Sequence, residues 1–561
     1  MRRGNKILTA EVTVSAESVD PGPVGHRVQI VDYDSSIRSF YRQAALPADG
    51  ADPIPTDAEI LGDPAFHARN VYALVMATLG RFEFALGRRL SWSFGTHQIK
   101  VVPHAFEAAN AFYSPQCEAL LFGYVRGHER PVFTCLSHDV VVHETTHALL
   151  DGLRSRFMAP TSPDQAAFHE GYADIVALLS VFTLREVLDG LLDDATGSST
   201  AAGAPALPPA RQGLIHRDLL KPDRLRESVL FGMAEELGPE LTGVRVNALR
   251  RSITLEPDVH ILQRLEFLEA HRRGEVVVAA VMRAFLEVWT KRLEAMGTID
   301  DAFLDRRRVA EEGAGVADQL LTMMIRAIDY TPPVNLGFGD FLSALITADT
   351  EVRDDDSKYR LRASLLNWFG QYGIKPASGT ADGVWLRSNL QLARQGVRFG
   401  SLQSDPTEIF RLIWDNRELL ELDVPAHTQV TSVRPCLRIG PEDGLPQRET
   451  VAECMQFLSI TAKELGRYGL VKPAGMADDQ KIKLEGGSTL ILDEYGMLKY
   501  EVHSRLPKSR DPADTRAAQE RLDYLWNQGY YDVGASFAAR LSNLHRRRLY
   551  DDVAVPRSEV W

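Results

Sequence analysis

The sequence predicts an α+β fold, with strands in two parts of the chain and helices between them. Short apolar runs typical of strands occur before residue 130, in HQIKVVPH, ANAFYS and ALLFGYV. Helical periodicity dominates from about residue 214 to 375, where GEVVVAAVMRAFLEVWTKRLEAM is strongly apolar. Beyond residue 376 a hairpin pattern follows, GGSTLILDEYGMLKYEVH. Together these observations predict a lobe with a small sheet, a mostly helical lobe and an appended C-terminal α+β region.

The length of 561 residues allows several hydrophobic cores, and changes in composition suggest four segments. Residues 1–60 are extended and turn-rich, and residues 61–190 carry the candidate site. Residues 191–375 are expected to form the helical lobe, and residues 376–561 a C-terminal region of unknown role. The stretch DDATGSSTAAGAPALPPARQ, residues 193–212, predicts a flexible surface loop near the start of the helical lobe.

Individual elements are predicted from periodicity and from turn residues. The hairpin near the C-terminus is expected to turn at Tyr495–Gly496. Helices are predicted at residues 66–89, 139–157, 166–186 and 514–548.

Charge and composition exclude several classes of protein. The formal net charge is -13, from 63 basic and 76 acidic side chains, which argues against binding to nucleic acid or to anionic membranes. The four cysteines have no CxxC spacing, so neither a disulfide framework nor a thiolate zinc site is suggested. No apolar run of about 18 residues predicts a membrane span, and no secretory signal is recognised. A cytoplasmic location is therefore expected, and the oligomeric state is left open.

The stretch VVVHETTHALLDG, from Val140 to Gly152, contains an HExxH pattern on a predicted helix. His143 and His147 stand four residues apart, so both imidazoles can reach one metal ion. Glu144 lies about 100° around the helix from His143, where it can act as a general base beside the metal. The alternative is an amphipathic helix whose histidines have ordinary hydrogen-bond partners.

A catalytic zinc ion needs a third protein ligand, and the next predicted helix offers one in AAFHEGYADIVALLS. Glu170 is the expected ligand, and Asp174, one turn later, is expected to accept the second N–H of a ligating histidine. His169 competes with Glu170 for the role of ligand. Both carboxylates could instead belong to a solvated helix face, but the rest of this helix is apolar.

The run DVVVHETTHALLDG followed by EGYAD resembles the thermolysin-like gluzincin zinc metallopeptidases. The resemblance covers roughly residues 65–370 and is strongest at the two zinc helices. It implies a thermolysin-like zincin fold, with Zn²⁺ held by His143, His147 and Glu170. It also implies a peptide or protein substrate, which would be hydrolysed with Glu144 as general base.

Three further stretches extend the resemblance. NAFYSPQCEALLFGY resembles the edge strand of this family, which implies that Asn110 and Ala111 hold the substrate. GVRVNALRRSI resembles the segment whose arginine contacts the substrate carbonyl, here Arg250. EAHRRGEVVVAAV resembles the segment with the histidine that binds the oxyanion, here His271, which Glu269 would orient. The alternatives are a turn residue, a surface arginine and a structural histidine.

The sequence also departs from the family pattern. Asp139 matches an acidic residue of a calcium site, but the partner position is Val181, so calcium is not expected. The stretch GLRSRFMAPTSP has no tyrosine to assist the oxyanion. No propeptide is recognised, so residues 376–561 are a candidate cover for the cleft.

The sequence thus predicts a zinc-dependent metallopeptidase. Two alternatives stay open. One is a non-catalytic zinc-binding or scaffold module with a peptidase-like fold, and the other is a zinc hydrolase that acts on a non-peptide acyl substrate.

Overall fold

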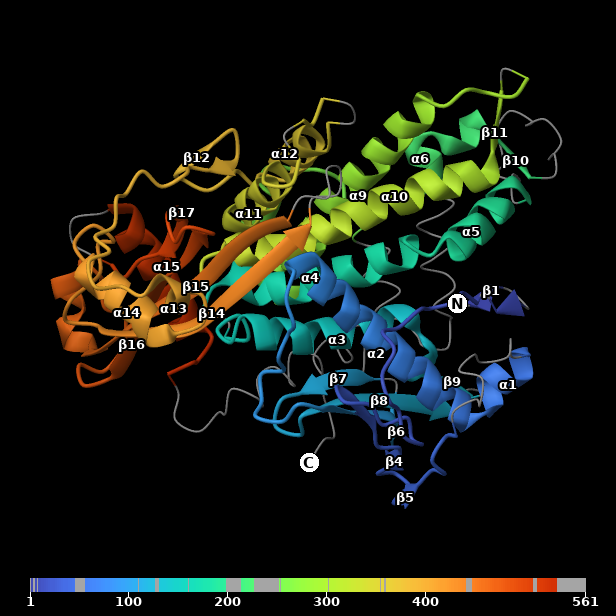
Figure 1. Ribbon diagram of the computed structural model, residues 1–561, viewed down its shortest axis with the longest axis horizontal. Helices are drawn as coiled ribbons and strands as arrows, with labels where there is room; N and C mark the ends of the chain where they lie inside the picture. The colour runs from blue at the N-terminus through green and yellow to red at the C-terminus, as the bar shows by residue number, and fades with distance from the viewer. Residues whose placement is uncertain are drawn as a thin grey trace.

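The computed structural model confirms a mixed α+β chain. Figure 1 shows a sheet at the bottom, long helices at the upper right and a second sheet at the left. The structure describes residues 2–531 except 4–5, 8, 46–55, 109, 127–130, 160, 198–212, 227–251, 253, 301, 354, 358–359, 440–445 and 508–511.

The first sheet has three parallel strands and two short antiparallel ones. Strands β3 (Val28–Ile30), β6 (Ile99–Glu107) and β8 (Ala119–Arg126) lie side by side and parallel. Strands β7 (Ala111–Ser114) and β9 (Pro131–Phe133) both pair antiparallel with β8. Because β6 occupies one side of β8, β7 and β9 follow each other along its other side. Strand β7 is therefore an edge strand of the described sheet.

Helices α2 (Pro64–Leu86) and α3 (His138–Leu153) lie against this sheet, and α4 (Pro163–Phe182) packs against α3. Helix α2 starts where the Asp63 carboxylate accepts hydrogen bonds from two backbone N–H groups of the first turn. Helix α3 ends four residues before the predicted end at 157, because the chain turns at Arg154, whose guanidinium is completely buried.

The helical lobe is built around α9 (Ala270–Glu294), which is buried on all sides from Gly274 to Met282. The other long helices of the lobe are α5 (Arg185–Gly197), α10 (Arg306–Ala327), α11 (Phe338–Thr350) and α12 (Leu361–Gln371). Helix α5 occupies the first residues of the predicted 193–212 loop, and the rest of that stretch lies outside the described residues. Among the described helices, none is both long and apolar enough to cross a membrane.

The second sheet is antiparallel, in the order β14 (His427–Ile439), β15 (Pro446–Thr461), β16 (Lys481–Asp493) and β17 (Leu498–Ser504). The predicted hairpin is confirmed between β16 and β17, where Gly496 adopts a φ of 71°. Helix α15 (Pro512–Asn527) is shorter than the predicted helix 514–548, since the chain turns after Asn527, and residues 532–548 lie outside the described part.

A buried ion network joins this sheet to the rest of the molecule. Asp329, completely buried after α10, binds Arg88 through two contacts of 2.6 and 2.7 Å, and also binds Arg438 of β14. Arg438 in turn reaches Glu449 of β15 at 2.6 Å. Burial alone would raise the pKa of Asp329, but the adjacent Arg88 and Arg438 lower it well below its ordinary value.

Arg154 makes a second connection directly at the end of α3. Its guanidinium lies 2.6 Å from Glu453 of β15 and donates to the Ile328 backbone carbonyl. It also donates to the Thr489 hydroxyl of β16 at 3.3 Å. The C-terminal sheet is thus attached to the helix that carries the HExxH motif.

We expect Asp329→Asn to lower the free energy of unfolding by about 3–5 kcal/mol, because it leaves the buried Arg88 guanidinium without its counter-charge and removes one of the two carboxylates that bind Arg438. Urea denaturation measures this loss. The control is Asp318→Asn, since Asp318 pairs with Arg81 at 2.7 Å but is 56% exposed. That substitution should cost about 0–1 kcal/mol. Equal losses in the two variants would contradict the importance of the buried network.

The same network predicts an acid dependence of stability. Because the folded-state pKa of Asp329 lies below its ordinary value of 3.8, its ionised form contributes stability above about pH 4. That contribution is lost as the pH falls further. Between pH 4 and pH 2 the parent should therefore lose more unfolding free energy than Asp329→Asn. Parallel curves of unfolding free energy against pH for the two proteins would contradict this.

Candidate metal centre

Two histidines of α3 and a glutamate of α4 converge in the interior. The Nε2 atoms of His143 and His147 lie 2.8 Å apart. Glu170 Oε2 lies 3.6 Å from the first of these nitrogens and 3.8 Å from the second. Each residue is at most 4% exposed. The structure therefore brings together the three residues that the sequence selects as metal ligands.

Asp174 fixes the orientation of the first imidazole. Its Oδ1 atom lies 2.8 Å from Nδ1 of His143 in an ion-pair contact, and Nε2 of the same ring faces the cluster. A carboxylate behind a histidine is the usual support of a metal-binding imidazole. Two imidazoles and one carboxylate also form a common donor set of catalytic zinc. The residues present thus fit a zinc ion.

His169 lies beside this cluster without joining it. Its ring stacks on the His147 ring, with centroids 4.6 Å apart and planes 11° from parallel. Neither of its ring nitrogens has a hydrogen-bond partner among the described residues. Burial lowers the pKa of His169 to about 4. Of the two neighbouring candidates, Glu170 presents its ligand atom to both other donors.

Glu144 is buried between α3 and the edge strand. Its Oε2 accepts a hydrogen bond from the backbone N–H of Tyr113 in β7, at 3.1 Å. The Tyr113 hydroxyl donates to Asp151 of α3 at 2.8 Å, which holds β7 against this helix. Ala111 begins the same strand and Asn110 directly precedes it, where the Asn110 side chain accepts from the Ala111 N–H. The edge strand therefore lies directly beside the candidate base.

Tyr113 has a role in the site that the sequence analysis did not identify. The signal was present in ANAFYS, because strand alternation places Tyr113 on the same face as Ala111.

His271 approaches the cluster from the first turn of α9. Its Nε2 lies 3.4 Å from Glu170 Oε2, and its Nδ1 lies 2.7 Å from Glu269 Oε1. Glu269 also caps α9 by accepting from the backbone N–H groups of His271 and Arg272. Burial alone would raise the pKa of Glu269, but these hydrogen bonds and the His271 charge lower it to about 2.

A backbone contact between two glycines sets this approach of α9 to α4. A Cβ atom on Gly274 would lie 2.8 Å from the Ala167 carbonyl oxygen, and one on Gly171 would lie 2.9 Å from the Gly274 carbonyl oxygen. Real side chains do not fit at such distances, so glycine permits the close crossing. The crossing places His271 beside Glu170.

Two other positions from the sequence analysis are not part of the cluster described above. Arg250 lies outside the described residues. Asp139 accepts a hydrogen bond from the Ser137 hydroxyl at 2.5 Å, and Val181 is buried among apolar side chains.

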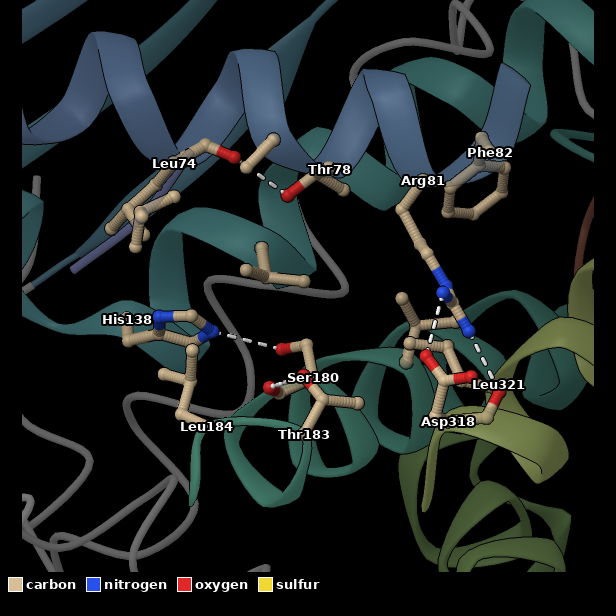
Figure 2. Close-up of a pocket in the computed structure, with 14 residues that line it drawn as sticks. Leu74, Thr78, Arg81, Phe82, His138, Ser180, Thr183, Leu184, Asp318 and Leu321 are labelled. Carbon is tan, nitrogen blue, oxygen red and sulfur yellow. Dashed lines mark hydrogen bonds and ion pairs between the residues drawn. The ribbon is translucent and has the colours of Figure 1, made fainter. Parts of the chain in front are cut away.

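A separate cavity of about 170 Å³ lies among α2, α3, α4 and α10. Figure 2 shows His138 bonded to Ser180 on one side and Arg81 paired with Asp318 on the other. Most of its lining is apolar, and no residue of the metal cluster lines it. The cavity is therefore distinct from the candidate metal centre.

In comparisons with known proteins, no family model and no curated sequence matches this chain significantly.

We expect Gly274→Ala to destabilise the protein by about 1–3 kcal/mol, because the added methyl group forces α4 and α9 apart. Chemical denaturation measures this change. Gly80→Ala in α2 is the matched control, since a Cβ there meets no atom within 4 Å. A glycine-to-alanine change in an open helical position should stabilise the protein by about 0.5–1 kcal/mol. The two variants should therefore change the free energy of unfolding in opposite directions. Equal changes would contradict the close crossing of α4 and α9.

Proposed function

We propose that this protein is a zinc-dependent metallopeptidase with a thermolysin-like fold. One observation carries the proposal: a buried His–His–Glu cluster lies beside a buried glutamate that is bonded to an edge strand. The cluster provides ligands for zinc, the glutamate provides a base, and the strand provides a place for an extended peptide. These three parts are what hydrolysis of a peptide bond requires.

His143, His147 and Glu170 would hold the ion, with Asp174 supporting His143. When bound in such a site, zinc polarises a carbonyl group and lowers the pKa of water. Glu144 would take the proton of the attacking water and later pass a proton to the leaving amine.

The position of β7 supports a peptide substrate. An edge strand offers backbone hydrogen bonds to an added strand, and these bonds grip a peptide whatever its side chains. Asn110 and Ala111 stand at the start of β7, and Tyr113 of the same strand contacts Glu144. A peptide aligned with this edge would pass the candidate base.

His271 would stabilise the developing oxyanion. Its Nδ1 is hydrogen-bonded to Glu269, and its Nε2 lies 3.4 Å from Glu170 at the cluster. When both ring nitrogens carry a hydrogen, Nε2 can donate to an oxyanion.

A scaffold protein with the same fold is the main alternative. Such a protein has no need for a buried carboxylate beside its metal, so the position of Glu144 favours an enzyme. A non-peptide acyl substrate is compatible with the same chemistry, and the edge strand favours a peptide.

Incubation of the zinc-loaded protein with a mixed peptide library, read by mass spectrometry of new termini, tests the proposal. We expect cleavage by the parent and a loss of at least about 10²–10⁴-fold in Glu144→Gln, because removal of a general base costs that much. The zinc content of Glu144→Gln should equal that of the parent, whereas His143→Ala should lose the ion.

Two results would contradict the proposal. Cleavage by Glu144→Gln at the parent rate would exclude Glu144 as the base. A zinc-loaded parent that cleaves no peptide would favour the scaffold, and cleavage of an ester library alone would favour a different acyl substrate.

A further inference from the structure

A second cluster of metal-binding side chains lies in the described part of the chain and shares no residue with the first. His67 of α2, His104 of β6 and Cys135 each direct one donor atom to a common point, and these atoms lie within 4.8 Å of one another. Cys135 belongs to a short 3-10 helix, η1 (Thr134–Leu136), just before α3. The three side chains are at most 1% exposed.

Hydrogen bonds at the outer nitrogens define how the two imidazoles are oriented. Nε2 of His67 lies 2.8 Å from the Ile60 carbonyl oxygen, so this nitrogen carries a hydrogen. Nδ1 of His104 lies 2.9 Å from Asp32 Oδ1 and likewise donates to it. The inner nitrogens, His67 Nδ1 and His104 Nε2, are then the lone-pair sides of two neutral rings. These two nitrogens lie 2.8 Å apart. Two lone pairs that face each other at this distance repel, so a cation is needed between them.

A proton is one such cation, and a metal ion is the other. A proton shared by two nitrogens needs no third donor, yet the Cys135 sulfur lies at the same point. A histidine that binds metal usually donates its other N–H to a carboxylate or a backbone carbonyl, and both histidines here do so. The separation of the inner nitrogens also equals the 2.8 Å between His143 and His147.

We propose that His67, His104 and Cys135 form a second metal site, which binds one soft or borderline transition-metal ion. Thiolate and imidazole together suit zinc or copper and do not suit calcium or magnesium. As a free thiol Cys135 is neutral, because burial raises its pKa. Binding of the ion releases this proton to solvent and leaves a thiolate ligand.

The surroundings indicate a structural role for this ion. The Phe133 ring lies 4.6 Å from the His67 ring and 5.2 Å from the His104 ring, so the site is enclosed by aromatic groups. The ion would tie α2, the first sheet and η1 together. Because α3 begins just after η1, the second site would fix the start of the helix that carries His143 and His147.

Cobalt is the probe that separates the two sites. The protein is stripped with a chelator, reloaded with Co²⁺ and examined for a thiolate-to-cobalt charge-transfer band in the near ultraviolet. The first centre has no sulfur ligand, so only the second site can produce this band. We expect the band in the parent and in His143→Ala, and its loss in Cys135→Ser. The control Cys117→Ser changes an exposed cysteine and should keep the charge-transfer band.

Metal analysis of the protein as isolated gives an independent readout and identifies zinc or copper. Relative to the parent, Cys135→Ser and His143→Ala should each lose half of the bound metal, and the double variant should lose all of it. Absence of the charge-transfer band in the cobalt-loaded parent would overturn the proposal and leave a proton between the two histidines. The band of the cobalt-loaded parent tests the second site even if Cys135→Ser fails to fold. Failure here would leave the first centre unaffected, because His143→Ala reports on that centre alone.

Discussion

Buried ion pairs connect the separate parts of this protein, because a charge removed from water is costly to leave without a counter-charge. Asp329 is matched by two arginines, and Arg154 is matched by Glu453. At the candidate metal centre, two imidazoles and a carboxylate converge, and Nε2 of His271 lies 3.4 Å from Glu170. Two imidazoles and one carboxylate are a donor set that suits a divalent cation.

Helix α3 connects these features. At its C-terminal end, Arg154 binds the C-terminal sheet, and on its inner face it carries His143, Glu144 and His147. The C-terminal sheet therefore does more than follow the helical lobe in sequence, since β15 and β16 contact the end of the helix that carries the HExxH motif. A change in that sheet should be felt at the metal centre through α3, because a rigid helix transmits displacement along its length.

Local patterns in the sequence predicted the parts of the site that lie within one helix. The spacing of His143 and His147, and of Glu170 and Asp174, places each pair on one face whatever the tertiary structure is. Contacts between residues far apart in the sequence leave no such local pattern. Tyr113 reaches Glu144 across 31 residues, and the α4–α9 crossing depends on two glycines in separate helices. The cysteine spacing suggested no thiolate site, yet Cys135 meets two histidines that are 37 residues apart in sequence. No short motif encodes such a meeting.

The most direct test of the central claim is a crystal structure of the zinc-loaded protein with anomalous diffraction recorded on both sides of the zinc absorption edge. The account predicts an edge-dependent peak bounded by His143, His147 and Glu170, with Glu144 beside it and His169 outside its ligand set. A map with no peak at that position, or with the ion held by His169 in place of Glu170, would contradict it.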